Sequence, residues 1–292
     1  MLIQQLPGVD VRPSITTPDG TVFQLPTEKP LHPVWLELAC YLGKRFRSDW
    51  CTSSDSIVQA EFAHYPSAEA FYRESEVYLY HLLGYWLEGY KRPAHAWLLQ
   101  STGNMRCSVL DYGCGVGCDG LWFLDAGYDV SFADVPSPSL EFLRWRLRQR
   151  WYFGAPVYEV PLTPNVPQHT FVWAMDVIEH LPPVEHVPFL EHLASLGNIV
   201  LINLINDVQA DGTVHHPVDI EGLTAAIRQR WSLIYQDYYL ARTGNQTRFL
   251  CYGPAVPVAL LKGLSLEGTG MVTGDPEDRP AQQVLEGAYE QA

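Results

Sequence analysis

Basic residues are scarce in this sequence: 19 Lys and Arg stand against 33 Asp and Glu, and the formal net charge is −14. A chain with this charge repels a phosphate backbone, so we expect no nucleic-acid partner. The densest basic stretch is RWRLRQR, at residues 144–150. Its arginines occupy alternate positions of a predicted helix and do not share one face, which is typical of a solvated helix rather than a binding surface.

The sequence also lacks a Cys-x-x-Cys pair, a long apolar run and a basic start. Its six cysteines favour reduced thiols over a disulfide framework. No apolar stretch approaches the length of a membrane span, and residues 1–7 do not resemble a signal peptide. These absences predict a cytoplasmic protein without a membrane partner, and they do not indicate an oligomeric state.

The N-terminal region, residues 1–105, is predicted to be mainly helical. Hydrophobic residues make up 47% of the chain and charged residues 18%, as in folded proteins. The sequence TPDG at 17–20 predicts a turn within a small hairpin. Helices are predicted at 33–46 and from the N-cap Ser67 to Tyr90, where Lys91-Arg92-Pro93 ends the pattern. The second helix carries an aromatic stripe, which either lines a substrate site or, more commonly, packs in a core.

Strand and helix patterns alternate over residues 106–262. Strands are predicted at 108–112, 129–133, 157–160, 171–176, 198–203, 233–239 and 247–252, and helices at 118–126, 138–151, 184–195 and 219–230. This alternation predicts an α/β, doubly wound, mostly parallel seven-stranded sheet. The short connection at 242–246 has no room for a crossover helix, so the last two strands should form an antiparallel hairpin. Residues 263–292 are predicted to form a mobile acidic tail.

A glycine-rich loop, DYGCGVGC at residues 111–118, follows the first strand of this region. Gly113, Gly115 and Gly117 allow the backbone to turn tightly and to lie close to a ligand. The dinucleotide-binding fingerprint places its third glycine at position 118, which here is Cys118. The pattern suits instead a ligand without a pyrophosphate, whose amino and carboxylate ends meet Asp111 and the loop amides.

With these residues, the chain from about 107 to 253 resembles the class I S-adenosylmethionine-dependent methyltransferases, which implies S-adenosylmethionine as the cofactor. Asp134, at the predicted end of the second strand, would accept hydrogen bonds from the ribose hydroxyls. Many members carry an acid after the third strand, whereas this sequence has VPLTP at 160–164, so apolar and backbone groups would hold the adenine. The implied cofactor-binding residues are Asp111, Gly113, Cys114, Gly115, Gly117, Asp134, Val135, Leu162 and Asp176.

Asp176, Glu179 and His180 crowd one turn at the end of the fourth strand, where ligands of parallel sheets bind. Three interpretations stay open: a site for Mg²⁺, Mn²⁺ or Zn²⁺, a histidine general base, or a helix N-cap with a capping box. The turn resembles that of the ubiquinone-pathway O-methyltransferases. It also resembles that of the small-RNA 2′-O-methyltransferases, whose metal ligands include a later histidine. Here that histidine is His215 or His216, and the candidate metal ligands are Asp176, Glu179, His180 and His216.

The predicted function is methyl transfer from S-adenosylmethionine to a small molecule, with oxygen favoured as the acceptor atom. His180 and His215 are the predicted catalytic residues, because a hydroxyl acceptor must lose its proton. Residues 1–105 would act as a lid or substrate region. The alternatives are N-methylation of a small molecule and a non-catalytic S-adenosylmethionine-binding protein. A radical enzyme with the same cofactor is disfavoured, because Cys114 and Cys118 lack a third cysteine at cluster spacing.

Overall fold

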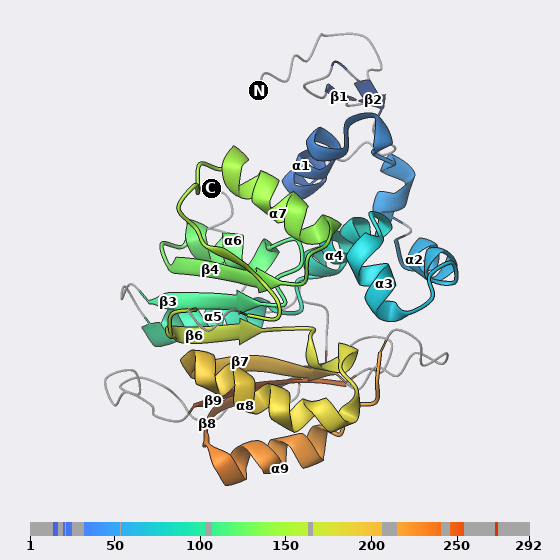
Figure 1. Ribbon diagram of the computed structural model, residues 1–292. Helices are drawn as coiled ribbons and strands as arrows, with labels where there is room; N and C mark the ends of the chain where they lie inside the picture. Colours follow the sequence, from blue (N-terminus) through green and yellow to red (C-terminus); the bar gives the residue numbers. More distant parts are fainter. Residues whose placement is uncertain are drawn as a thin grey trace.

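A central sheet organises the molecule (Figure 1). The computed structural model describes residues 14–16, 20, 22–24, 32–52, 54–102, 107–162, 166–205, 215–240, 246–253 and 272–273. The sheet has the strand order β10-β8-β9-β7-β6-β3-β4-β5, and β9 alone runs antiparallel to its neighbours in this described part. The strands are β3 Ser108–Tyr112, β4 Asp129–Asp134, β5 Val157–Glu159, β6 His169–Ala174, β7 Gly197–Ile205, β8 Ser232–Leu240, β9 Gln246–Gly253 and β10 Val272–Thr273.

This arrangement confirms the predicted doubly wound sheet and its terminal hairpin. All seven predicted strands are present, and β8 and β9 pair antiparallel as expected. The fourth predicted strand, 171–176, is shifted: β6 ends at Ala174, because the chain turns at Asp176 with a positive φ of 59°. The short strand β10 adds an eighth member parallel to β8. It lies within the stretch predicted to be a tail, and the rest of that stretch lies outside the described residues.

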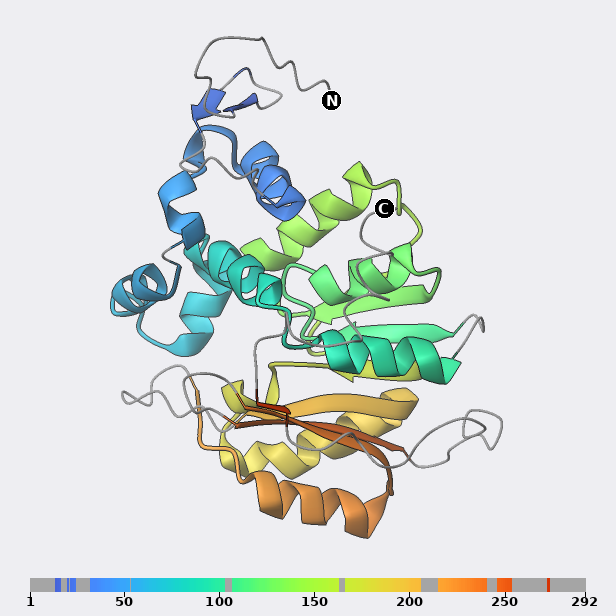
Figure 2. The ribbon, with the colours of Figure 1, turned by 180° about the vertical axis from the view of Figure 1, so that it is seen from behind.

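Helices cover both faces of the sheet. Helices α8 (His186–Leu196) and α9 (Ile220–Arg230) lie on the face turned to the viewer in Figure 1. Helices α5 (Arg92–Thr102) and α6 (Cys118–Asp125) cover the opposite face, seen in Figure 2. Successive strand residues point to opposite faces, so alternate apolar residues join the two cores. A sheet buried on both faces explains the nearly continuous apolar strands of the sequence.

The N-terminal helices differ in part from the prediction. Strands β1 (Ser14–Thr16) and β2 (Val22–Gln24) form the predicted hairpin, and α1 (Pro33–Leu42) lies within the predicted first helix. A further helix, α2 (Ser54–Phe62), was not predicted. The single helix predicted from Ser67 to Tyr90 is wrong, because it is divided into α3 (Ala68–Glu74) and α4 (Val77–Leu87).

The physical reasons for these helix limits are local. Ser67 caps α3 as predicted, since its hydroxyl oxygen accepts the N–H of Ala70 at 3.2 Å. Ser75 ends α3 with extended backbone, and its hydroxyl oxygen accepts the N–H of Tyr78 at 3.3 Å at the start of α4. Pro93 does not end a helix. It lies in the first turn of α5, where the missing N–H of proline has no helical partner to lose.

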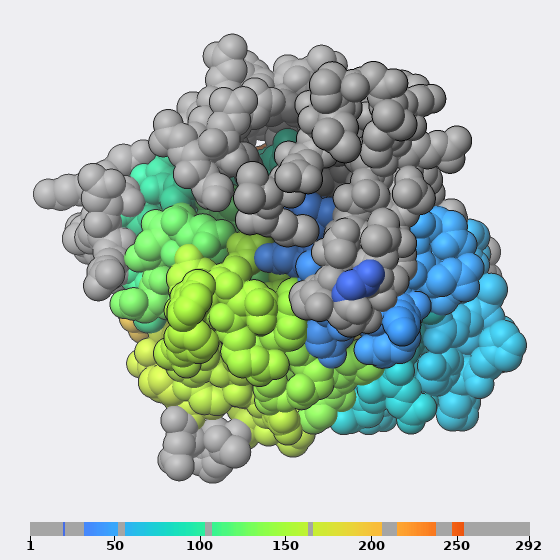
Figure 3. Space-filling view, turned by 90° about the horizontal axis from the view of Figure 1, so that it is seen from above, coloured from blue at the N-terminus to red at the C-terminus, as the bar shows by residue number. Residues whose placement is uncertain are grey.

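The N-terminal helices pack at the carboxyl edge of the parallel strands (Figure 1). Helix α1 also packs against α7 (Pro138–Gln149), which Figure 3 shows as blue beside yellow-green. Glu37 of α1 accepts hydrogen bonds from Arg146 at 2.8 Å and from Arg150 at 2.7 Å. The role of residues 1–105 as a lid stays a prediction. Among the described residues, no helix is long and apolar enough to cross a membrane.

Candidate active site at the carboxyl edge of the sheet

Three strand ends meet where the order of the sheet reverses direction. The chain runs from β3 outward through β4 to β5, then returns to β6 on the other side of β3. Such a switch point is where α/β sheets bind ligands. The glycine loop follows β3, Asp134 ends β4, and the turn containing Asp176 follows β6. The predicted site residues are therefore gathered at one edge.

The glycine loop has the backbone that its sequence predicts. Gly113, Gly115 and Gly117 have φ values of 68°, 52° and 73°, a region that other residues rarely adopt. A Cβ atom at Gly113 would lie 2.3 Å from Val177 Cγ2, and one at Gly117 would lie 2.3 Å from Leu143 Cδ1. The loop is thus pressed between the turn after β6 and helix α7.

Asp111 and Asp134 accept backbone N–H groups from the loop and from the helix that follows it. Asp111 is 3% exposed, and its carboxylate accepts the N–H of Gly120 at 2.9 Å, which joins β3 to the start of α6. Burial and the charge of Asp119 raise the pKa of Asp111. Asp134 accepts the N–H groups of Gly115 and Val135, and burial raises its pKa to about 6.

The remaining residues expected near the cofactor flank these strands. Val135 follows β4 and Leu162 follows β5, and both are half-buried. Their contact with adenine stays a prediction. Cys114 lies inside the loop, where burial and the charge of Asp134 raise the pKa of its thiol. A raised thiol pKa disfavours the thiolate and so disfavours a nucleophilic role for Cys114.

Asp176 does not cap a helix, so the capping-box interpretation is wrong. The turn Ile178–His180 is a short 3-10 helix without a side-chain cap. The backbone N–H of Asp176 donates to the side-chain oxygen of Asn203 at 2.7 Å, and the side-chain amide of Asn203 donates to the Asp176 carboxylate at 2.6 Å. The same carboxylate accepts a hydrogen bond from the Tyr90 hydroxyl and lies 2.8 Å from Lys91 Nζ. Asp176 is not part of the group that Glu179 and His180 form with His215.

Lys91 and Asp119 form a buried ion pair that the sequence did not indicate. Lys91 Nζ lies 3.0 Å from Asp119 Oδ2, and Trp86 and Trp173 donate their indole N–H groups to Asp119 at 3.1 and 3.2 Å. Burial alone would lower the pKa of Lys91, but the charges of Asp119 and Asp176 raise it above its usual range. Burial would raise the pKa of Asp119, yet Lys91 and His95 hold it below its usual range. Both groups are therefore charged.

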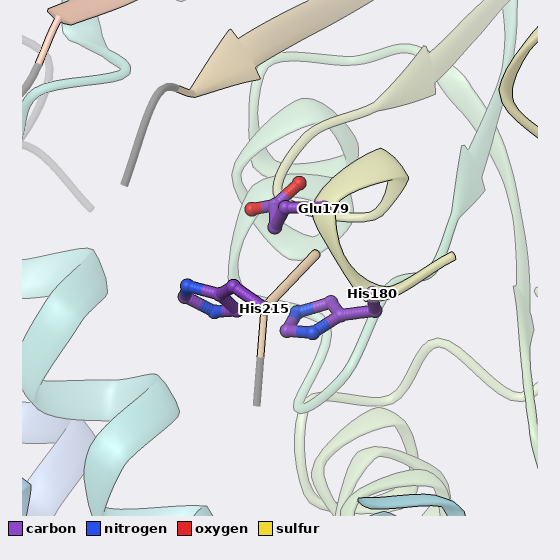
Figure 4. A group of neighbouring side chains, drawn as sticks. All are labelled: Glu179, His180 and His215. Atoms are coloured by element: carbon purple, nitrogen blue, oxygen red, sulfur yellow. The ribbon is translucent and has the colours of Figure 1, made fainter. Parts of the chain in front are cut away.

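Glu179, His180 and His215 form a second cluster at the same edge (Figure 4). One possible ligand atom from each lies within 4.8 Å of the others, and Glu179 is 2% exposed. The backbone N–H of His216 donates to the carbonyl of Glu179 at 2.7 Å, which places His215 beside His180 with ring centroids 4.9 Å apart. His216 itself is exposed. Of the four candidate metal ligands, Glu179 and His180 belong to this cluster.

Sequence comparisons identify no family model and no curated protein that matches the chain. Comparison of structures finds the magnesium protoporphyrin IX methyltransferase of Synechocystis PCC 6803. In the structure of its complex with S-adenosylhomocysteine, the matched sequence is 16% identical to this one, the match covers 71% of this chain and 97% of that chain, and the TM-score is 0.52. Its complex with S-adenosylmethionine is 15% identical, with 72% and 99% covered and a TM-score of 0.51. The chain therefore has the fold of the class I S-adenosylmethionine-dependent methyltransferases, as the sequence predicts.

Proposed function

We propose that this chain is an S-adenosylmethionine-dependent methyltransferase that methylates an oxygen atom of a small molecule. The observation that carries this proposal is that the glycine loop, Asp134 and the cluster of Glu179, His180 and His215 share the carboxyl edge of one sheet. The loop amides and Asp111 would hold the methionine end of the cofactor, and Asp134 would hold its ribose. The fold it shares with a structure that contains bound S-adenosylmethionine supports this assignment.

The transfer needs alignment above all. The acceptor oxygen attacks the methyl carbon, the new C–O bond forms as the C–S bond breaks, and S-adenosylhomocysteine leaves with the electron pair. A neutral hydroxyl must also give up its proton. We assign the acceptance of this proton to His180 or His215, which lie together in the cluster, and such a general base contributes about 10²- to 10⁴-fold to a rate. An amine acceptor with a free lone pair would need no such group at this edge.

Glu179, His180 and His215 also suit a divalent cation. One carboxylate and two imidazoles are ligands for Zn²⁺, Mn²⁺ or Fe²⁺, whereas Mg²⁺ prefers oxygen ligands. Buried Glu179 and the nearby imidazoles match this set without Asp176, whose carboxylate is held by Tyr90 and Lys91. A bound cation would lower the pKa of an acceptor hydroxyl. We include this metal in the proposal as a second route to the same proton loss.

The net charge and the cysteines support the proposed substrate class and compartment. A net charge of −14 disfavours a nucleic-acid acceptor, and we propose a small molecule in its place. All six cysteines are free thiols, which supports the reducing cytoplasm as the place of action.

The test combines cofactor binding with turnover. We expect calorimetry to detect binding of S-adenosylmethionine, and a panel of phenols, sugars and amines to yield S-adenosylhomocysteine with the hydroxyl compounds. His180→Gln should lower kcat by about 100-fold or more and leave cofactor affinity unchanged. The matched control, His64→Gln, changes an exposed histidine and should have no effect.

The other outcomes separate the alternatives. Turnover of amines alone would favour N-methylation, and binding without turnover on any acceptor would favour a non-catalytic protein. A chelator should abolish activity, and added Zn²⁺ or Mn²⁺ should restore it, if the cluster holds a metal. If a histidine acts alone as the base, the chelator should have no effect.

A further inference from the structure

Tyr72 contacts the proposed reaction site from the N-terminal region. It lies in α3, and its hydroxyl oxygen is 2.9 Å from Nδ1 of His180 in the turn after β6. The two rings also meet edge to face, with centroids 4.9 Å apart. The residues are 108 positions apart in the sequence, so only the packing of α3 on the sheet edge brings them together.

The Tyr72 ring is fixed by its neighbours and is uncharged. It packs against Phe71 and Tyr78, with ring centroids 5.6 and 5.0 Å away. Burial, followed by the negative charge of Glu179, raises the pKa of Tyr72 well above its usual range. The group that meets His180 is therefore a neutral phenol, whose hydroxyl can either donate a hydrogen bond or accept one.

The direction of this hydrogen bond decides the protonation of the other ring nitrogen. If the Tyr72 oxygen accepts from Nδ1–H, then Nε2 of neutral His180 carries the lone pair, and if the hydroxyl donates, Nε2 carries the proton. Nδ1 is the ring nitrogen that meets Tyr72, and Nε2 is the nitrogen that both routes of the proposed function use, which requires the proton of neutral His180 to lie on Nδ1. Figure 4 shows the His180 ring reaching from its backbone toward His215.

We propose that Tyr72 is a positioning residue, which accepts the Nδ1–H of His180 and so keeps Nε2 available to take a proton or bind a cation. This inference rests on the proposed function for its consequence, since both routes to an activated hydroxyl need the lone pair on Nε2. It also gives the N-terminal region a part in the chemistry. The base is complete only when α3 is packed on the sheet edge.

The test measures the tautomer directly. Long-range ¹H–¹⁵N spectra of the full chain with ¹⁵N-labelled histidine, at about pH 8.5 where imidazoles are neutral, report which nitrogen carries the proton. The His180 signal is assigned by its loss in His180→Gln. We expect the Nδ1–H form in the unchanged protein and a shift toward Nε2–H in Tyr72→Phe. The matched control is Tyr65→Phe, because the Tyr65 hydroxyl donates to Glu61 on the preceding helix, and it should leave His180 unchanged.

Kinetics add a second measurement. Tyr72→Phe should lower kcat by about 10- to 100-fold, as loss of a group that orients a ligand or base does, with KM and cofactor affinity unchanged. An Nε2–H form of His180 in the unchanged protein, or the same tautomer in Tyr72→Phe, would overturn the inference. The spectra need neither cofactor nor acceptor. A failure to bind S-adenosylmethionine would therefore refute the proposed function alone, and the tautomer would still decide the role of Tyr72.

Discussion

Gly117→Ala tests how the glycine loop is held. Gly117 has a φ of 73°, and an added Cβ atom would lie 2.3 Å from Leu143 Cδ1 and 3.1 Å from its Cγ atom. Two costs therefore add. The left-handed backbone costs a non-glycine residue about 1–2 kcal/mol, and forcing a methyl group into a packed site costs a further 1–3 kcal/mol or so. We expect a loss of about 2–5 kcal/mol in the free energy of unfolding.

Gly127→Ala is the matched control, because it separates the two costs. Gly127 also has a positive φ, 89°, but nothing lies within 4 Å of its added Cβ atom. Only the backbone cost applies, so we expect a loss of about 1–2 kcal/mol. Urea unfolding of both variants and the unchanged chain measures the difference, which belongs to the contact with Leu143.

Calorimetry with S-adenosylmethionine completes this experiment. Displacement of Leu143 or of the loop should weaken cofactor binding in Gly117→Ala and leave it unchanged in Gly127→Ala. Equal losses of stability in the two variants would show that Leu143 does not hold the loop. Unchanged affinity in Gly117→Ala, despite a larger loss of stability, would show that the loop does not bind the cofactor.

Two further predictions concern buried charges. Because burial raises the pKa of Asp134 to about 6 and ribose hydroxyls would favour its charged form, cofactor binding near that pH should release a proton. Affinity should then rise with pH by up to about tenfold per unit below pH 6 and level off above it. Calorimetry in two buffers measures this, and the same slope in Asp134→Asn would contradict it. Lys91→Met should cost about 3–5 kcal/mol in urea unfolding near neutral pH, since it leaves Asp119 and Asp176 buried without the positive charge of Lys91. A loss below about 1 kcal/mol would contradict this account.

The fold could be predicted because its signals are local and repeated. Each parallel strand is a short apolar run, and each crossover helix has its own start and stop residues, as Ser137 shows by accepting the N–H of Leu140 at the start of α7. The glycine loop could be predicted for the same reason. Gly113, Gly115 and Gly117 have positive φ values, which glycine adopts readily, so the glycines themselves indicate the loop.

The errors arose where two local signals compete. Lys91-Arg92-Pro93 is compatible with the end of one helix or the start of the next, and proline is accepted in both places. The structure uses it as a start. In the sequence, Ser75 is a single polar residue within an aromatic stripe. In the structure its backbone ends α3, and its hydroxyl oxygen accepts the N–H of Tyr78 at the start of α4. Periodicity continues across such a break, so the stripe alone gives no warning of it.

The partners of the site residues could not be predicted, because they depend on tertiary packing. The sequence alone does not indicate which of the adjacent residues His215 and His216 faces the site. One backbone hydrogen bond, from the N–H of His216 to the carbonyl of Glu179, decides which ring meets His180. Asp176 likewise has the spacing of a metal ligand in the sequence, yet Tyr90 takes part in holding its carboxylate elsewhere.

The buried charges join the regions on either side of the predicted boundary near residue 105. Asp119 follows the glycine loop, but its cation, Lys91, comes from the turn between α4 and α5, and Trp86 comes from α4. Without those groups, Asp119 would be a buried carboxylate lacking its cation, a state that costs several kcal/mol. The predicted boundary therefore does not separate the charged residues into two independent groups. The carboxyl edge that would receive the cofactor is built jointly by the helical region and the sheet.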